Sequence, residues 1–171
     1  MPISKLLLAT LIIVPILFAC NKGDSQMTAD TLITAPDFSL VDENNQTHTL
    51  SDYKDQYVLI YFYPKDDTPG CTKEACSIRD SIHRFESKNI QVFGISSDSP
   101  ASHKKFKNKY QLPFTLLSDQ KKEVAKLYHA DGILLKRISY LIAPGGTILK
   151  HYPNVSPSSH AGDILDDFDA L

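Results

Sequence analysis

The chain has 171 residues, of which 42% are hydrophobic and 22% charged, and its formal net charge at pH 7 is -2. This length favours one domain with a core of ordinary size, and the composition is that of a globular protein. The slightly acidic balance gives no electrostatic reason to expect nucleic acid as a partner.

The first twenty residues differ from the rest of the chain. Lys5 precedes an uncharged apolar stretch, residues 6–19, which has signal-peptide length and is shorter than the roughly 20 residues of a membrane span. It ends at Ala19-Cys20, which resembles a bacterial lipobox, where the cysteine is lipidated and becomes the first residue. An ordinary cleaved signal peptide and an uncleaved apolar tail are the alternatives.

We therefore expect a signal peptide over residues 1–19, followed over residues 20–34 by a lipidated Cys20 and a flexible polar tether. The lipid would hold the protein on the periplasmic side of a bacterial membrane, with the inner or outer membrane left open. The folded domain would cover residues 35–171.

In the first half of that domain, the sequence predicts a hairpin and a central strand, followed by a polar loop. Residues 38–41 and 47–50 predict an N-terminal β-hairpin, and Ser51 is placed to cap a short helical turn after it. Residues 58–63 are continuously apolar, β-branched or aromatic, which indicates a buried central strand. A loop with two prolines and a glycine follows over residues 64–70.

The second half alternates helices and strands. Helices are predicted over residues 71–88, from Pro100 to residue 110 with Ser99 as N-cap, and over 120–128 and 160–171. Strands are predicted over residues 90–96 and 114–117, with a final hairpin over 138–143 and 147–151. This order predicts a three-layer α/β fold with a mixed central sheet.

Two cysteines lie in the predicted helix that follows the central strand. Cys71 falls on its apolar stripe and Cys76 falls on the opposite, polar side. Because Cys71 lies at the helix N-terminus, free N–H groups and the helix dipole favour its thiolate. We expect a lowered pKa and a nucleophilic sulfur. The rest of the stripe consists of Ala75, Ile78, Ile82 and Phe85.

The spacing of Cys71 and Cys76 restricts how they can form a disulfide. Five residues of helix correspond to about 7.5 Å of rise and roughly 140° of rotation, which separates the Cα atoms by about 8 to 9 Å. A disulfide needs less than about 7 Å. The sulfurs can join only if the first turns of the helix unfold. Since so short a loop constrains the unfolded chain little, the pair favours a chemical role over a structural one.

The segment 61–72, with sequence YFYPKDDTPGCT, resembles the active-site segment of peroxiredoxins. The family pattern of proline, three residues, threonine or serine, two residues and cysteine is filled by Pro64, Thr68 and Cys71. A second cysteine five residues on, here Cys76, is typical of the peroxiredoxin Q group, also called bacterioferritin comigratory protein.

The likeness extends over residues 32–171. Residues 93–99 and 116–119 are similar to later family segments, and residues 137–142 match the strand that begins with the active-site arginine, here Arg137. Two departures lie outside the catalytic set. Ala143 stands where aspartate is common, and residues 129–136 lack the usual aromatic-glycine pattern.

The resemblance implies a thioredoxin-like fold and a thiol peroxidase that reduces hydrogen peroxide and organic hydroperoxides in antioxidant defence. Cys71 would be the peroxidatic residue that is oxidised to sulfenic acid, and Cys76 would resolve it as an intramolecular disulfide. A thioredoxin-like dithiol, exported like the enzyme, would then reduce the disulfide. The subgroup implies a monomer, and the resemblance implies no cofactor.

The resemblance also implies roles for the residues around the sulfur. Thr68 would hydrogen-bond the thiolate and the peroxide, and Pro64 would shield the sulfur from water. Arg137 would hold the thiolate and stabilise charge developing across the O–O bond. The backbone N–H groups of Gly70 and Cys71 would receive the peroxide oxygens.

Two other functions fit the cysteines less well. In a thiol-disulfide oxidoreductase on the same fold, two residues typically separate the two cysteines, whereas four residues separate Cys71 from Cys76. A thioredoxin-like copper-binding module would need the same pair as joint ligands. The six histidines lack metal-ligand spacing, and we expect no metal.

Overall fold

The computed structural model describes residues 33–171. The predicted signal peptide, Cys20 and the tether up to residue 32 lie outside the described residues. Backbone pairing begins one residue before the domain start expected at residue 35, because Thr34 already forms a β-bridge with Thr147. Within the described range, no helix has both the length and the apolar character needed to cross a membrane.

The seven strands form one mixed sheet in the order β2-β1-β5-β4-β3-β6-β7. The central pairs β3–β4 and β4–β5 are parallel, and the other four are antiparallel. The predicted hairpins are both present, as β1–β2 and β6–β7. The strands are β1 Ser39–Asp42, β2 Thr47–Thr49, β3 Tyr57–Phe62, β4 Ile90–Ser96, β5 Thr115–Ser118, β6 Ile138–Ile142 and β7 Ile148–Tyr152.

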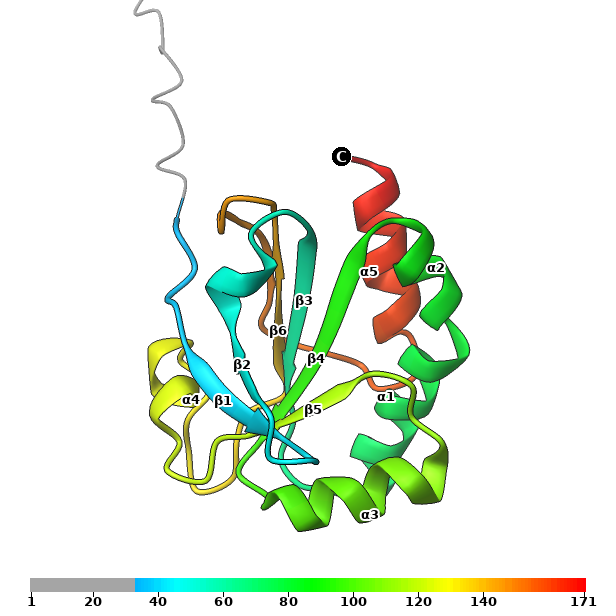
Figure 1. Cartoon of the computed structure of the whole chain (residues 1–171). Helices are drawn as coiled ribbons and strands as arrows, with labels where there is room; N and C mark the ends of the chain where they lie inside the picture. The colour runs from blue at the N-terminus through cyan, green and yellow to red at the C-terminus, as the bar shows by residue number, and fades with distance from the viewer. Residues whose placement is uncertain (1–32) are drawn as a thin grey trace, which may run out of the picture. The chain divides into compact units, whose positions relative to one another are not determined.

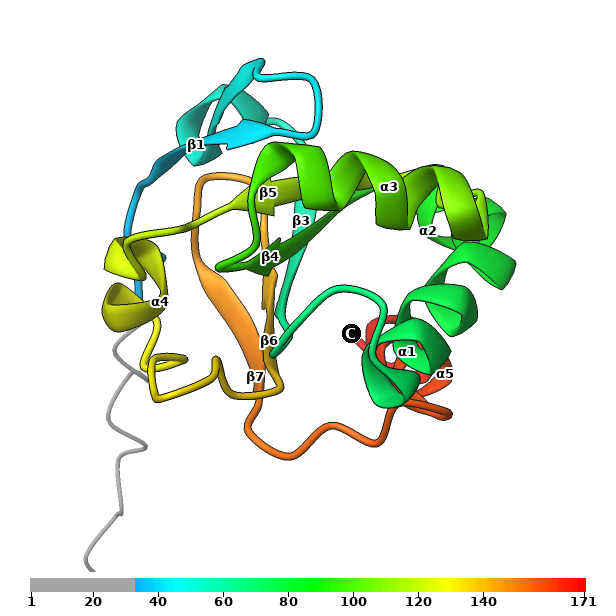
Figure 2. The same cartoon turned by 90° about the horizontal axis from the view of Figure 1, so that it is seen from below.

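The helices cover both faces of this sheet. Figures 1 and 2 show α1, α2, α3 and α5 over one face and α4 beside the other, which confirms the predicted three layers. The helices are η1 Leu50–Tyr53, α1 Pro69–Asp80, α2 Ile82–Ser87, α3 Pro100–Tyr110, α4 Glu123–Leu127 and α5 His160–Asp169.

The central strand β3 contributes to a core on each face. Val58, Ile60 and Phe62 belong to the cluster under α4, and Leu59 and Tyr61 belong to the cluster under α1 and α5. Successive side chains of a strand point to opposite faces, so a strand buried on both sides is apolar throughout. This is why residues 58–63 show no polar alternation.

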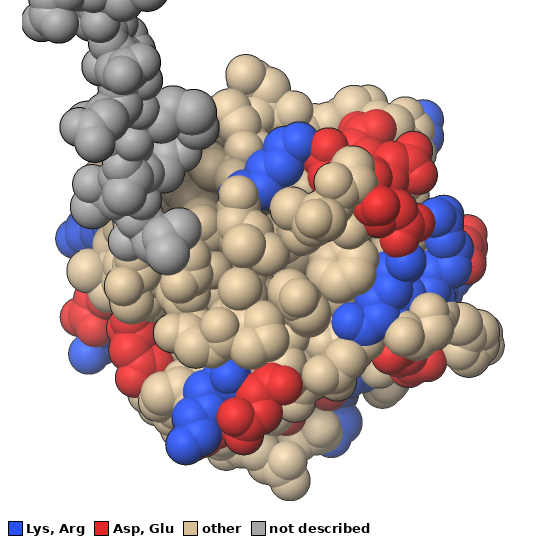
Figure 3. All heavy atoms as spheres, turned by 90° about the horizontal axis from the view of Figure 1, so that it is seen from above, with Lys and Arg blue, Asp and Glu red and all other residues tan. Residues whose placement is uncertain are grey.

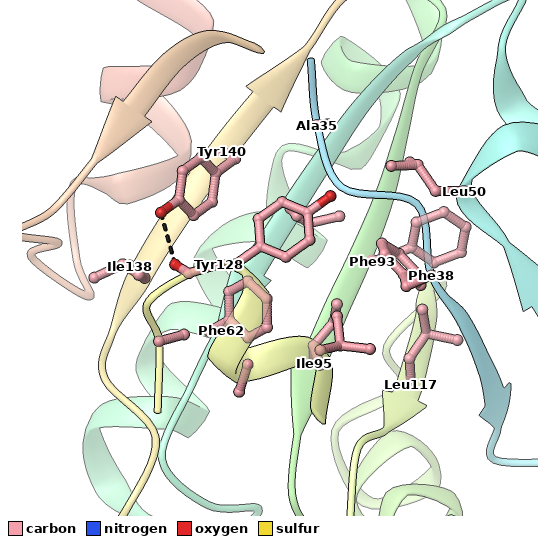
Figure 4. Packing of buried hydrophobic residues seen from close by; sticks show 14 of the residues in the cluster. Ala35, Phe38, Leu50, Phe62, Phe93, Ile95, Leu117, Tyr128, Ile138 and Tyr140 are labelled. Carbon is pink, nitrogen blue, oxygen red and sulfur yellow. Dashed lines mark hydrogen bonds between the residues drawn. The ribbon is translucent and has the colours of Figure 1, made fainter. Parts of the chain in front are cut away.

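The cluster on the α4 side is rich in aromatic rings (Figure 4). Tyr128 packs against Phe62 and Phe38, with ring centroids 5.6 Å and 6.2 Å apart. The hydroxyl of Tyr140 donates to the backbone carbonyl of Tyr128 at 2.7 Å. These contacts attach the end of α4 to strand β6.

Three predicted helices have different bounds, and the last of them ends at Asp169 instead of residue 171. The predicted helix 71–88 starts two residues earlier, at Pro69, and is divided at Ser81, whose φ of -106° and ψ of 5° end α1. The predicted helix 120–128 shortens to α4 because Lys122 has φ of 56°. The Asp119 carboxylate then accepts the N–H groups of Glu123 and Ala125.

Charged side chains of both signs intermingle at the end of the molecule opposite the start of α1 (Figure 3). That face carries no extended surface of a single sign. An extended basic surface is the usual electrostatic footprint of nucleic-acid binding.

Gly94 in β4 leaves room for the side chain of Tyr61 in the neighbouring parallel strand β3. A Cβ built on Gly94 would lie 2.6 Å from the Tyr61 hydroxyl and 2.8 Å from Leu116 Cδ2. No real Cβ tolerates such contacts, so Tyr61 can occupy this position only because residue 94 lacks a side chain.

We expect Gly94→Ala to lower the free energy of unfolding by about 1–3 kcal/mol, because it overpacks a closed core. Denaturant titration measures the change. Gly162→Ala in α5 is the matched control, since nothing lies within 4 Å of its added methyl group. A helical alanine there is neutral or stabilising by up to about 1 kcal/mol. Equal stabilities of the two variants would contradict this account of Gly94.

Candidate active site

The loop between β3 and α1 is tied to the body of the domain by buried polar contacts. The Asp66 carboxylate accepts the Tyr63 hydroxyl at 2.7 Å and lies 3.0 Å from Nδ1 of His103 on α3. The backbone N–H of Asp66 donates to Asp98 at 2.8 Å. Burial, and then the Asp66 charge, raise the pKa of Tyr63 well above its usual value, so its hydroxyl stays a donor.

Cys71 lies in the first turn of α1, and its side chain is buried at 1% exposure. Thr68 is the N-cap, and its carbonyl accepts the N–H of Thr72 at 2.8 Å. The N–H groups of Gly70 and Cys71 precede that bond and have no partner within residues 33–171. The start of α1 thus supplies free N–H groups and the positive end of the helix dipole beside the sulfur.

Arg137 approaches this sulfur from the residue immediately before β6. Its Nη2 donates to Cys71 Sγ at 3.3 Å. The same atom would lie 3.2 Å from a Cβ on Gly70, so the absence of that side chain lets the guanidinium approach the helix. The sequence predicted Cys71, Gly70 and Arg137 as site residues, and the fold brings them together across 66 positions of chain.

Glu74 completes an ion pair that the sequence analysis missed. Its carboxylate is fully buried and accepts Nη1 of Arg137. Partial burial opposes the Arg137 charge, but Glu74 and Cys71 outweigh that effect and raise the pKa of the guanidinium, which stays charged. A signal was present, because Glu74 lies one helical turn after Cys71, next to the buried stripe.

Thr68 and Pro64 lie in the segment just before Cys71 and form no hydrogen bond to its sulfur within residues 33–171. The Thr68 hydroxyl donates to the carbonyl of Lys65 at 3.0 Å, whereas the sequence analysis expected it to bond the thiolate. The donor proton therefore stabilises the loop, and only the oxygen lone pairs remain free to accept. Pro64 is half-buried at the start of the same loop.

Cys76 lies on the other side of the same helix. Cys71 and Cys76 are free thiols, and Cys76 is half-exposed beside an open groove formed with Lys73, Asp80 and Ser158. Because α1 is continuous from Pro69 to Asp80, the two cysteines keep the helical separation that is too long for a disulfide.

A second open groove, of about 700 Å³, lies at Arg137. Ile138, Pro153 and Val155 line it together with polar residues of the segment after β7. Arg137 itself lines this groove, and its side chain is 19% exposed. In the described residues, no cluster of His, Cys, Asp or Glu is arranged to hold a metal ion.

Comparison with known proteins identifies the family. Residues 33–151 match the AhpC/TSA family. Chloroplastic peroxiredoxin Q from Oryza sativa subsp. japonica is 44% identical over 142 residues, and that of Arabidopsis thaliana is 40% identical over 150 residues. These alignments cover 80% and 85% of this chain but 65% of each relative, slightly under two thirds of its length.

Solved structures share the whole fold. Peroxidoxin BcpB from Mycobacterium tuberculosis has a TM-score of 0.77 at 31% identity, over 82% of this chain and 96% of that one. The bacterioferritin comigratory protein of Xanthomonas campestris has a TM-score of 0.74 at 27% identity, over 78% and 90%. The expected thioredoxin-like fold is therefore confirmed.

The comparisons contradict the predicted location. The relatives at 40–44% identity are named as chloroplastic proteins, so the expected bacterial periplasmic lipoprotein is wrong. That expectation depended on residues 1–20, where an apolar run before a cysteine is a short and unspecific pattern. The match over residues 33–151 and the shared fold lead to one conclusion: the chain belongs to the AhpC/TSA family and is a peroxiredoxin of the Q type.

Proposed function

We propose that this chain is a thiol peroxidase that reduces hydrogen peroxide and organic hydroperoxides with Cys71. The observation that carries the proposal is the contact of 3.3 Å between Arg137 Nη2 and Cys71 Sγ, at the first turn of α1. A fixed cation and a helix N-terminus both stabilise the thiolate, which is the nucleophilic form of cysteine. Family membership supports the same reaction.

In the proposed reaction, the Cys71 thiolate attacks the distal oxygen of ROOH. An S–O bond forms as the O–O bond breaks, the sulfur is oxidised to sulfenic acid, and the departing alkoxide takes a proton to become alcohol or water. Arg137 and the N–H groups of Gly70 and Cys71 face the oxygens on which charge develops. Thr68 accepts a hydrogen bond from the peroxide, and Pro64 keeps water from the sulfur.

Cys76 then attacks the sulfenic acid, forming the S–S bond and releasing water. A thioredoxin-like dithiol restores both thiols by exchange. The half-exposed position of Cys76 beside an open groove supports access of such a protein. We propose that the enzyme acts as a monomer, because every residue of this cycle comes from one chain.

The two other functions considered for Cys71 and Cys76 have less support. A dithiol oxidoreductase needs both sulfurs at one helix start, and here Cys76 lies on the far side of α1. A copper module needs joint ligation, and residues 33–171 offer no metal-binding cluster.

Cysteine variants separate the two proposed steps. We expect Cys71→Ser to abolish peroxide consumption, because no nucleophile remains at the helix start. Cys76→Ser should consume one equivalent and stop as the sulfenic acid, until an added thiol restores turnover. Stopped-flow peroxide assays and mass spectrometry measure both. Sustained turnover by Cys71→Ser would refute the proposed function.

Removing the guanidinium should slow the first step without preventing it. We expect Arg137→Gln to lower the rate constant of Cys71 oxidation about 100-fold, the usual effect of losing one donor at a developing charge. Arg84→Gln is the matched control, because Arg84 is half-exposed on α2 and its nearest carboxylate is 4.0 Å away. If the two variants react equally fast, Arg137 has no part in the chemistry.

Formation of the disulfide should unfold the start of α1. We expect backbone amides of residues 71–76 to lose hydrogen-exchange protection in the oxidised protein, with a matching loss of helical circular dichroism. The Cys76→Ser protein, oxidised to sulfenic acid, is the control and should keep the helix. An oxidised wild type with unchanged protection would contradict the geometric argument.

A further inference from the structure

A group of buried polar side chains lies behind the active site and takes no part in the proposed cycle. His160, the first residue of α5, has 1% exposure, and its Nδ1 lies 3.0 Å from Oε1 of Glu74. The contact has ion-pair distance without aligned hydrogen-bond geometry. Catalytic contacts in substrate-free enzymes are often misaligned in this way and tighten on binding.

The two oxygens of Glu74 have different partners. Oε2 bonds Arg137, which in turn contacts Cys71. Among residues 33–171, Oε1 has only His160 within ion-pair distance. A fully buried carboxylate is stable only when it is paired and hydrogen-bonded. His160 is therefore the fourth member of a chain of contacts that begins at the sulfur and ends on the C-terminal helix.

Aromatic neighbours hold the His160 ring in place. In the described part of the chain, His160 is the only ion-pair partner of Glu74 besides Arg137. Tyr61 and Tyr152 meet the ring edge-on, with centroids 6.3 Å and 6.2 Å away. Burial raises the pKa of Tyr61 well above its usual value, with Glu74 adding to the effect, and burial also raises that of Tyr152. Both phenols thus stay neutral. Ser139, paired with Tyr61 and Tyr152 in the sheet, carries no charge.

The charges explain why such a partner is useful. With Cys71 ionised, one guanidinium serves two anions, and the closer carboxylate competes with the thiolate for it. A donor on the second oxygen of Glu74 weakens that competition and fixes the carboxylate. Arg137 then keeps Nη2 directed at the sulfur.

We propose that His160 is a positioning residue for peroxide reduction. Its Nδ1–H holds the buried Glu74 carboxylate, and Glu74 in turn holds Arg137 on the sulfur of Cys71. The inference rests on the proposed peroxidase function. It also gives α5 a chemical role, since this helix otherwise only covers one face of the sheet.

The test compares His160→Phe with His160→Asn in the Cys76→Ser protein, where oxidation of Cys71 is a single turnover. Phenylalanine keeps an aromatic ring but donates nothing, whereas the asparagine amide places a donor near the position of Nδ1. We expect the phenylalanine variant to lose at least 10-fold in rate constant and in thiolate absorbance at pH 7. The asparagine variant should stay within threefold of the parent.

The control is His83→Asn, because the His83 side chain is 96% exposed on α2. This variant should leave the rate constant of Cys71 oxidation unchanged. A double-mutant cycle shows whether His160 acts through the carboxylate. In a Glu74→Gln background, His160→Phe should add less than a twofold loss. A rate unchanged by His160→Phe, or a full loss that persists in the Glu74→Gln background, overturns the inference.

The unaltered protein supplies a measurement that does not depend on variants folding. Nitrogen NMR of the histidine rings should show a proton on Nδ1 of His160 in the reduced enzyme, and an unprotonated Nδ1 overturns the proposal. If the Cys76→Ser parent consumes no peroxide, the proposed function itself fails. The NMR result still decides the contact between His160 and Glu74 in that case.

Discussion

The active site depends on one partly buried guanidinium that contacts two side chains. Arg137 contacts the sulfur of Cys71 with one nitrogen and the carboxylate of Glu74 with the other. Without Glu74, a cation placed here would be buried against the positive end of a helix, which is unfavourable. Without Arg137, a thiolate would be buried unpaired, and the Glu74 carboxylate would keep only its contact with His160. The three side chains are stable only as a set.

The fold supplies this set through the order of its strands. The central strand β3 leads into the loop and the helix that carry Cys71 and Glu74, and its antiparallel neighbour β6 begins one residue after Arg137. Because β3 and β6 run in opposite directions, the end of one lies beside the start of the other (Figure 2). Cys71 and Arg137, which are 66 residues apart, thus meet beyond the ends of these two inner strands.

The loop between β3 and α1 is the most constrained part of the site. Its contacts reach α3 through His103 and the segment just after β4 through Asp98, so two other parts of the fold help determine its shape. Local openings have low free energy where few such contacts exist. In the proposed cycle the helix start must still unwind for a disulfide to form, and these loop contacts all lie before Cys71. Ser81 marks the end of α1 beyond both cysteines.

Local sequence determined the elements and the reactive cysteine. A strand buried on both faces has to be apolar throughout, and a helix that begins at Cys71 or Pro69 places the same sulfur at its N-terminus. The family motif added Pro64, Thr68 and Arg137 by spacing. The first twenty residues, by contrast, led to a location that the comparisons overturn.

Only the tertiary structure revealed the second layer of the site. Glu74 and His160 are 86 positions apart, and a lone histidine at a helix start has no sequence feature that indicates its partner. The Thr68 hydroxyl likewise donates to the Lys65 carbonyl because of the loop geometry, which no motif specifies. Periodicity and spacing encode contacts along one element, whereas the pairing of buried charges is decided by how separate elements pack.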